Sequence, residues 1–313
     1  EQADIKLTYN GIHAYEIDLE EKHKSRAKLK EYCGNLLDYK PDYIFTHVTR
    51  MTPSKGLWRD FKVLEHIDKK FRKEGKTGVL FVLSTETHKR RKRDIYRMEA
   101  DYNWPVAHRE GMPDLTGGEA NYYTCVQEFN AKSRNVKAIY INQFGFDMES
   151  CGRRMPYDMD FMDIRKGSDA EFGQSIYEPF GIAQLEPLSF GGICVITNVC
   201  GCAGLVRDVT GGEEQNNVIV ADYTDLGSKT WRQDLEDFVI IDKDAREDIE
   251  LAVSKDVARK LYDRLPRNDD EMRTLINSGY NIAKHMNWDT IVESYVLKSI
   301  RNAVNKKHMA FGA

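Results

Sequence analysis

The sequence predicts an α/β protein built on a doubly wound, Rossmann-like sheet of six parallel strands with helices on both faces. Two observations support this prediction. Short apolar runs of strand length alternate along the chain with longer segments in which apolar residues recur at helical spacing. Turns containing glycine and proline separate several of these runs. Such alternation is typical of βαβ units, and the Rossmann pattern gives the strand order 3-2-1-4-5-6.

The composition is that of a globular chain with little preference for polyanions. Of the 313 residues 41% are hydrophobic, which is enough for a substantial core. Lys and Arg together number 46 and Asp and Glu 50, which gives a net charge of −4. This balance does not favour nucleic acid as a partner, and no apolar run approaches the length of a membrane span. We therefore expect a cytoplasmic protein with no nucleic-acid partner and no membrane contact.

The cysteines form neither a disulfide framework nor a paired Cys-x2-Cys zinc layout, so we expect reduced thiols. Cys200-Gly-Cys202 has no second pair of ligands nearby, and packing is favoured over a metal site there. No Asp-x-Asp or histidine cluster of ligand quality accompanies the candidate residues below, so no metal is expected. The six cysteines are Cys33, Cys125, Cys151, Cys194, Cys200 and Cys202.

The first predicted unit is helix, strand, cationic loop and helix. An amphipathic helix is expected over residues 20–38, because its apolar residues recur at i, i+3, i+4, i+7 and i+8. A buried strand follows at 43–48. The loop 49–56 then carries two cations, Arg50 and Lys55, and leads into a second amphipathic helix. Taken alone, these cations are ordinary surface residues near a turn.

The second unit contains an insertion. After a strand at 78–84, the polar, turn-rich segment 85–121 departs from the compact alternation, and it includes the basic run 88–93. Insertions of this length are usually functional loops or mobile segments, yet nothing in this one indicates a ligand. A solvated helix face is the favoured interpretation of the basic run, with a phosphate-rich or membrane-surface partner as the alternative. A short helix is expected near 93–101, followed by a helix at 121–132 and a strand at 136–142.

The stretch from Ser175 to Asn198 predicts strand, turn, helix and strand with two carboxylates built in. Pro179 and Gly181 mark the turn, and apolar residues then recur at helical spacing. Glu178 therefore lies before the helix and Glu186 on it. The N–H groups at the start of a helix are unpaired, so the backbone of Phe180-Gly181-Ile182 is suited to oxygen-rich ligands. The alternative is that both glutamates are solvated or capping carboxylates.

The remaining elements complete the sheet and close the chain with helices. Two more strands are expected, and the turn 199–203 between them is a candidate phosphate-facing loop. The final helix should have one broad apolar face, formed by Trp288, Ile291, Val292, Tyr295, Val296 and Ile300. The expected ranges are a short helix at 158–165, a strand ending near 175, strands at 193–197 and 217–221, and C-terminal helices within 244–304, at 244–265, 270–286 and 288–304.

The predicted strand order brings these motifs together. The first and fourth strands are neighbours in it, and they flank the switch point at which doubly wound sheets bind nucleotides. The loop after the first strand carries Arg50 and Lys55, and the loop after the fourth carries Glu178. We therefore expect two cations and two carboxylates around one crevice.

Tyr-Glu-Pro-Phe-Gly-x-x-x-Leu-Glu, at 177–186, resembles the donor-site signature of retaining GT-B glycosyltransferases of the glycogen and starch synthase type. Segment 49–56 resembles the Gly-Arg-Leu-x-x-x-Lys-Gly segment of the same family, with Thr49 in place of the first glycine. Leu7–His13 is similar to the passage that leads from the first domain of these enzymes into the second. The resemblance implies that residues 1–20 are an interdomain linker and that 21–313 form the C-terminal, donor-binding domain.

The resemblance also implies roles for individual residues. Glu178 and the backbone of the next residues would hold the donor sugar, and Glu186 the ribose. Arg50 and Lys55 would grip the diphosphate, whose growing charge as the glycosidic bond breaks is stabilised by fixed cations. The implied catalytic residues are Glu178, Arg50 and Lys55, and the implied donor-binding residues are Phe180, Gly181, Ile182, Glu186 and Phe144, the last at the nucleotide base.

The implied activity is transfer of a hexose such as glucose from a UDP-, ADP- or GDP-sugar to a saccharide or other acceptor with retention of configuration. No separate cofactor is implied. The acceptor would bind through an N-terminal domain that is missing from this chain. Two alternatives remain: a phosphorylase or synthase-like relative acting on a sugar phosphate, and a non-catalytic nucleotide-sugar-binding regulatory module.

Overall fold

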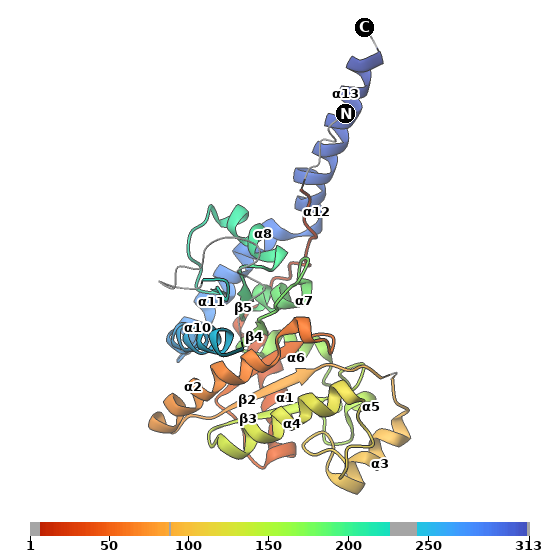
Figure 1. The fold of residues 1–313 in the computed structure, drawn as a ribbon, viewed down its shortest axis with the longest axis vertical. Coiled ribbons are helices and arrows are strands. Elements are labelled where there is room, and N and C mark those ends of the chain that lie inside the picture. Colours follow the sequence, from red (N-terminus) through yellow and green to blue (C-terminus); the bar gives the residue numbers. More distant parts are fainter. Residues whose placement is uncertain (1–6, 88, 226–242, 312–313) are drawn as a thin grey trace.

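The computed structural model describes residues 7–87, 89–225 and 243–311. Its centre is a six-stranded parallel sheet in the order β3-β2-β1-β4-β5-β6 (Figure 1). The predicted fold class and strand order are therefore confirmed. The strands are β1 (Tyr43–Val48), β2 (Gly78–Leu83), β3 (Val136–Ile141), β4 (Ala170–Gly173), β5 (Ile193–Thr197) and β6 (Val218–Ala221).

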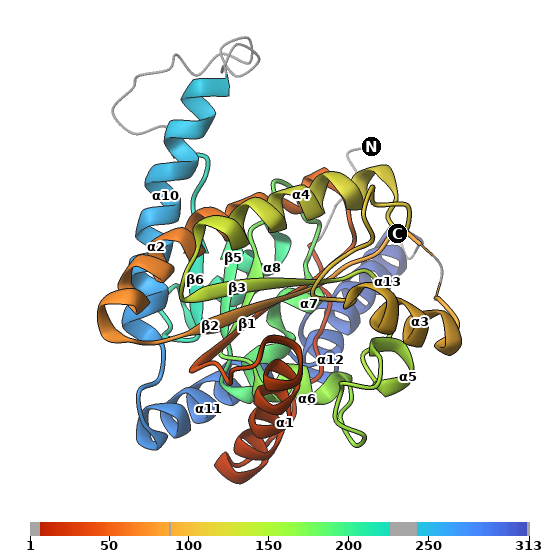
Figure 2. The same cartoon turned by 90° about the horizontal axis from the view of Figure 1, so that it is seen from below.

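Helices cover both faces of the sheet (Figure 2). Successive strand residues point to opposite faces, so Phe45 packs in the cluster beneath α2, α4 and α10, whereas Ile44 packs in the cluster beneath α1, α3 and α6. A third cluster joins β5 to α7, α8 and α11. The helices are α1 (Leu19–Leu37), α2 (Trp58–Glu74), α3 (Lys92–Tyr102), α4 (Gly117–Lys132), α5 (Met148–Cys151), α6 (Phe161–Gly167), α7 (Ile182–Leu185), α8 (Gly201–Thr210), α10 (Lys243–Arg264) and α11 (Asp269–Ala283).

The segment 85–121 is more structured than its polar composition indicates. Ile95 and Met98 of α3, and Trp104 after it, are buried in the second cluster. Helix α4 starts four residues before the predicted position, because Thr116 and Glu119 form a capping box at its N-terminus. The insertion is therefore anchored to the domain by its own core residues.

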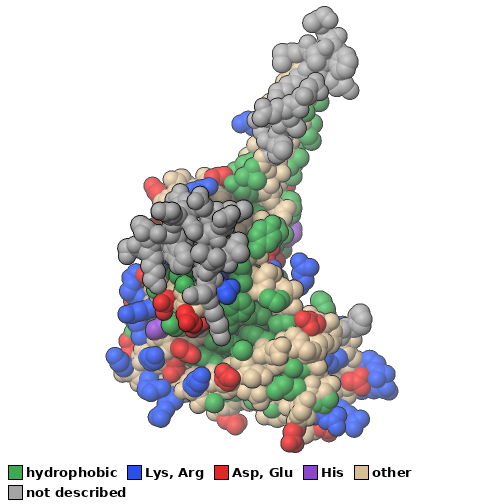
Figure 3. Space-filling view, viewed as in Figure 1, with side chains coloured by type: hydrophobic (Ala, Val, Ile, Leu, Met, Phe, Trp, Pro, Cys, Tyr) green, Lys and Arg blue, Asp and Glu red, His purple; other side chains and the backbone are tan. Residues whose placement is uncertain are grey.

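The last helices of the chain leave most of the predicted apolar face exposed. After the 3-10 turn η3 (Lys284–Met286), the chain runs through α12 (Trp288–Ile291), a π-helical turn η4 (Val292–Leu297) and α13 (Lys298–Phe311). Of the predicted apolar face only Ile291 is buried, whereas Trp288 and Ile300 are 41% and 53% exposed. The helix projects from the body of the domain, so most of this face has no sheet to pack on (Figures 1 and 3).

The N-terminal segment lies against these C-terminal helices. The Ile12 N–H donates to the Met286 carbonyl at 2.9 Å, and Ile12 pairs with Asn287 in a single parallel bridge. A Cβ at Gly11 would lie 2.7 Å from the backbone of Trp288, so the approach is close. None of the described helices is long and apolar enough to cross a membrane.

Candidate functional site

The loops that follow β1 and β4 pack tightly on each other at the switch point. The Ile176 N–H donates to the Ser54 carbonyl at 2.8 Å. Gly56 adopts a φ of 61°, and a Cβ there would lie 2.5 Å from the Gln174 carbonyl oxygen. Arg59 of α2 donates to that same carbonyl at 3.1 Å. These contacts therefore fix the position of the cationic loop relative to the loop that carries Glu178.

Lys55 and Glu178 form an ion pair between these loops. Lys55 ends the 3-10 turn η1 (Pro53–Lys55), and Glu178 lies five residues beyond β4. Each side chain is about 13% exposed, so the pair is only partly screened by solvent. A cation and a carboxylate that are 123 residues apart in the sequence thus share one location.

Arg50 lies on the same loop but is placed differently. It is exposed, and within the described part of the chain its guanidinium has no ion pair and no hydrogen bond. The backbone on either side of it is ordered by hydrogen bonds from Thr49 N to the Leu83 carbonyl and from Thr52 N to the Arg50 carbonyl. The structure therefore leaves Arg50 available to an anion, but it does not bring Arg50 into contact with Glu178.

A second turn, which contains Cys200 and Gly201, supports the turn 178–181. The Gly201 N–H donates to the Glu178 carbonyl at 3.1 Å, and the Cys202 N–H donates to the Phe180 carbonyl at 2.9 Å. A Cβ at Gly201 would lie only 1.9 Å from the Pro179 carbonyl oxygen. Only glycine fits at this position, so the Glu178 turn rests on a closely packed backbone.

The helix expected after this turn is shorter than predicted. Helix α7 is a single turn, and Glu186 begins the 3-10 helix η2 (Glu186–Phe190) instead of lying on a continuing α-helix. Pro187 explains the difference, because it has no N–H to continue the α-helical pattern but is tolerated in the first turn of a new helix. Glu186 therefore has the helical backbone that was predicted, with its N–H bonded to the Ile182 carbonyl, but the helix continues from it as a 3-10 helix.

The backbone of Phe180, Gly181 and Ile182, which we predicted to bind a ligand's oxygen atoms, lies between one buried and one partly exposed side chain. The Phe180 side chain is buried and that of Ile182 is 38% exposed, while Gly181 adopts a φ of 92°. The N–H groups of these three residues have no acceptor within the described chain. They are thus available to a ligand, although a single turn of helix contributes little dipole.

Glu186 makes an ionic contact that the sequence did not indicate. Its Oε2 lies 2.6 Å from Nη2 of Arg165, on α6, without the alignment of a hydrogen bond. Nη1 of Arg165 donates to Oε2 of Glu171 on β4 at 3.0 Å. Burial raises the pKa of the Glu171 carboxyl, and the nearby Arg165 opposes this effect. The available signal was a glutamate within a short apolar strand, Ala170–Gly173, since a buried carboxylate needs a partner.

Phe144 is remote from the ion pair. It follows β3 and its side chain is 59% exposed, with Gly145 at a φ of 91° behind it. Strand β2 separates β3 from β1, so Phe144 shares the carboxyl edge of the sheet with Lys55 but does not contact it. A ligand would have to extend across β2 to reach both.

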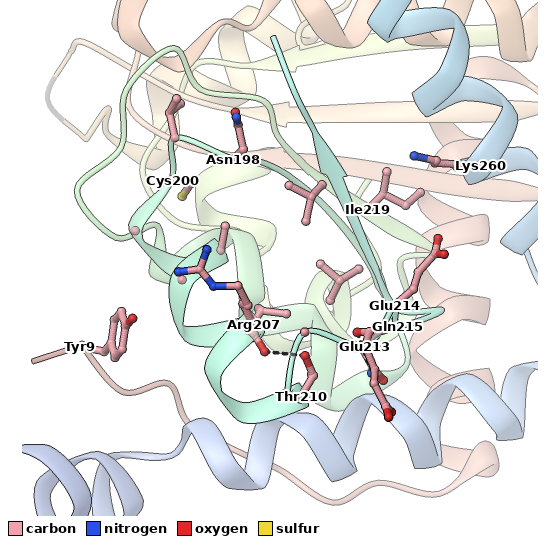
Figure 4. A pocket seen from close by; sticks show the side chains of 18 of the residues that line it. Tyr9, Asn198, Cys200, Arg207, Thr210, Glu213, Glu214, Gln215, Ile219 and Lys260 are labelled. Atoms are coloured by element: carbon pink, nitrogen blue, oxygen red, sulfur yellow. Dashed lines mark hydrogen bonds between the residues drawn. The ribbon is translucent and has the colours of Figure 1, made fainter. Parts of the chain in front are cut away.

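A cavity of about 770 Å³ lies beyond the Cys200 turn from this site. It is bounded by α8, the edge strand β6 and α10, and Figure 4 shows Arg207 and Thr210 of α8 on one side and Lys260 on the other. Neither Lys55 nor Glu178 lines it. The ion pair, not this cavity, therefore identifies the candidate site.

Cys200 and Cys202 lie close together behind the Glu178 turn. Their Sγ atoms are 3.1 Å apart, and Cys200 also donates to the Phe180 carbonyl at 2.9 Å. Both are free and buried. Among the described residues, no three histidine, cysteine or acidic side chains are grouped so as to hold a metal ion.

No protein-family model and no curated sequence matches the chain. Solved structures with a similar fold include the N-terminal domain of trehalose-6-phosphate phosphatase from Candida albicans (TM-score 0.54, 12% identity, covering 94% of this chain and 49% of that one). Sucrose-phosphate synthase from Thermosynechococcus elongatus is another (TM-score 0.52, 16% identity, covering 96% of this chain and 53% of that one). A third is α,α-trehalose 6-phosphate synthase from Burkholderia multivorans (TM-score 0.51, 11% identity, covering 93% of this chain and 49% of that one). At these identities the likeness shows the fold, and this chain spans about half the length of the structures it matches.

Proposed function

We propose that this chain is the donor-binding domain of a retaining glycosyltransferase that uses a nucleotide sugar. The observation that carries the proposal is the Lys55–Glu178 ion pair at the switch point between β1 and β4. Doubly wound sheets bind nucleotides at this point, and the pair offers one cation and one carboxylate there. Two of the three solved structures above are named as synthases of sugar phosphates, which agrees with this proposal.

The charges of the site suit a diphosphate leaving group. When the bond between the sugar and the diphosphate breaks, its electron pair stays on the phosphate oxygen, and Lys55 and Arg50 stabilise the resulting negative charge. Positive charge develops on the sugar ring at the same time, and the Glu178 carboxylate stabilises it. Lys55 is paired with Glu178 before a ligand arrives, so a bound donor would exchange part of that pairing for the diphosphate.

The acceptor side of the reaction belongs to the rest of a longer protein in this proposal. The chain spans about half of its structural relatives, and sites that take two substrates are commonly closed between domains. The 313-residue chain by itself should therefore bind the donor without transferring the sugar. Robust transfer by a homogeneous preparation of this chain would contradict the division of roles.

The proposal is tested by measuring the binding of UDP, ADP, GDP and their glucose conjugates by thermal shift and calorimetry. Glu178→Gln should weaken binding of the nucleotide sugar more than binding of the nucleoside diphosphate without the sugar, whereas Glu186→Gln should weaken both equally. Glu99→Gln is the matched control, because Glu99 is also largely buried and paired, with Arg154, but belongs to α3. No binding of any of these compounds to the wild-type chain would refute the proposal.

Turnover distinguishes an enzyme from a sensor. In the complete protein, Glu178→Gln should reduce turnover by a larger factor than it reduces donor affinity, since its charge matters most as the sugar ring becomes positive. Donor binding by the complete protein without turnover on any saccharide would instead identify a regulatory module.

A further inference from the structure

Three side chains form a continuous line of charge from β4, inside the sheet, to the partly exposed Glu186 at the start of η2. We call Glu171, Arg165 and Glu186 the ionic chain. Arg165 occupies its middle, with Nη1 3.0 Å from Glu171 Oε2 and Nη2 2.6 Å from Glu186 Oε2. Glu171 is fully buried and Arg165 is 2% exposed, whereas Glu186 is 37% exposed. The chain therefore has a rigid inner end and an accessible outer end.

Stability alone does not account for this arrangement. Removing a guanidinium and a carboxylate from water is costly, and apolar residues of similar volume often replace such pairs without loss. Arg165 is also imperfectly satisfied, because its buried Nε has no hydrogen-bond acceptor in the described part of the protein. The contacts that account for the position of the side chain are those to the two glutamates. The ring of Phe161 lies beneath the guanidinium, with its centroid 5.0 Å away.

Glu171, at the inner end of the ionic chain, also bonds to β1, the strand on the other side of the switch point. Glu171 Oε1 accepts from the Val48 N–H at 2.7 Å, and Oε2 accepts from the Thr46 hydroxyl. Val48 is the last residue of β1, and Arg50 follows two residues later. A single buried carboxylate on β4 therefore ties the start of the cationic loop to Arg165.

We propose that Arg165 is a positioning residue that holds Glu186 with its second carboxylate oxygen turned to the hydroxyl groups of a bound ribose, and that Glu171 fixes Arg165 in turn. This inference rests on the proposed function, because it takes the ligand to be a nucleotide. A glutamate side chain is flexible, and holding it before the ligand arrives removes an entropic cost from binding. Arg165 supplies that restraint without touching the ligand.

The test compares a nucleotide with its 2′-deoxy analogue. We expect the wild-type chain to bind UDP, ADP or GDP about tenfold more tightly than the matching 2′-deoxynucleotide, the loss of one hydrogen bond to a charged group. In Arg165→Gln and in Glu186→Gln this preference should disappear. The double variant should show no further loss of nucleotide affinity. Binding of inorganic pyrophosphate should stay within about twofold in both variants, because Lys55 and Arg50 are unchanged.

Arg26→Gln is the matched control for general damage. Arg26 is 9% exposed and pairs with the buried Asp169 at 2.6 Å. Asp169 directly precedes β4, so this pair lies at the amino end of the strand, away from the candidate site at the carboxyl ends. Arg26→Gln should lower stability and leave the preference for ribose intact. If Arg165→Gln does not fold, the Arg165→Gln/Glu171→Gln double variant removes both buried charges together, so the only ion left without its partner is the partly exposed Glu186.

The outcomes separate the two proposals. Retention of the ribose preference in a folded Arg165 variant overturns the positioning role while leaving the proposed function in place. Equal loss of pyrophosphate and nucleotide binding also overturns it, because the damage would then be general. If the wild-type chain binds none of the three nucleotides, the proposed function fails, and Arg165 then has only a structural role.

Discussion

Gly201→Ala tests whether the packing behind Glu178 matters for both stability and binding. A Cβ at this position would lie 1.9 Å from the Pro179 carbonyl oxygen, whereas real Cβ atoms do not approach closer than 3.0 Å, so the two backbones must separate by more than about 1 Å. The backbones that would part are those joined by the bonds from Gly201 N to the Glu178 carbonyl and from Cys202 N to the Phe180 carbonyl. The substitution therefore acts directly on the turn that carries Glu178.

The size of the effect follows from these contacts. Overpacking of this kind costs roughly 1–3 kcal/mol, and weakening two hydrogen bonds adds about 1 kcal/mol each. Replacing glycine restores roughly 0.4–1 kcal/mol through the unfolded chain. We expect a net loss of about 3 kcal/mol, which for a chain of this length lowers the melting temperature by about 5 °C. Because Glu178 moves away from Lys55, affinity for a nucleotide sugar should fall about tenfold or more.

Gly117→Ala is the control for this measurement. Gly117 is the first residue of α4, just as Gly201 is the first residue of α8, but a Cβ at Gly117 would meet nothing within 4 Å. Its melting temperature should equal or slightly exceed that of the wild type. Both variants are measured by thermal denaturation and by calorimetric titration with the nucleotide sugar that the wild type binds. A Gly201→Ala protein with wild-type melting temperature and affinity would refute the packing described for this turn.

Three further predictions address charge. Lys55→Ala and Arg50→Ala should each weaken binding of a nucleoside diphosphate by about 1.5–3 kcal/mol in calorimetry, with Lys55→Ala the worse because it leaves Glu178 unpaired beside the diphosphate; equal losses with a free nucleoside would count against both roles. Donor affinity should be the same with and without EDTA, since these cations supply the compensating charge, and a loss restored by magnesium would disprove this. Burial acts to raise the pKa of the Asp114 carboxyl, but hydrogen bonds from His108 and from a backbone N–H outweigh it and hold the pKa below 3.8. Asp114→Asn should therefore cost roughly 1–3 kcal/mol in urea unfolding at pH 7, and the difference from wild type should shrink as the pH falls below about 3.8; a difference independent of pH would exclude this contribution.

The charged residues of the site and the residues that support them come from different kinds of sequence segment. Lys55 and Glu178 come from loops that the strand order alone makes neighbours. Arg165 on α6, which contacts Glu186, comes from an element that carries no recognised motif, whereas Gly201, which supports the Glu178 turn, lies in the turn 199–203 that the sequence marked as a candidate phosphate-facing loop. Variants of the supports and of the charged pair should therefore be combined, because additivity between them would mean that the supports act independently of the pair.

Local patterns were sufficient for the sheet and for the cationic and acidic loops. Runs of buried β residues and helical periodicity depend on neighbours within a few residues, so the six strands could be predicted, and the Rossmann pattern of such alternation supplied their order. The same reasoning located Arg50, Lys55 and Glu178 at the carboxyl ends of adjacent strands. The form of the helix after Gly181, a single α-helical turn followed by the 3-10 helix η2 that begins at Glu186, was not predicted.

Burial of polar groups could not be predicted in this way. Lys22 occupies a polar position in the pattern of α1, yet it is 1% exposed and its Nζ donates to three backbone carbonyls, at residues 166, 168 and 190. Burial lowers the pKa of this amine to about 8. Nothing near Lys22 in the sequence marks these acceptors, because they come from parts of the chain more than 140 residues away.

The sequence by itself therefore determined the fold class, the strand order and the charged residues of the candidate site. The tertiary structure alone decided that Lys55 pairs with Glu178, that Arg165 joins Glu186 to Glu171, and that the apolar face of the last helix remains largely exposed. The physical reason is the range of the interactions. Periodicity and turn chemistry act over a few residues, whereas ion pairs and close backbone packing depend on which distant segments the whole core brings together.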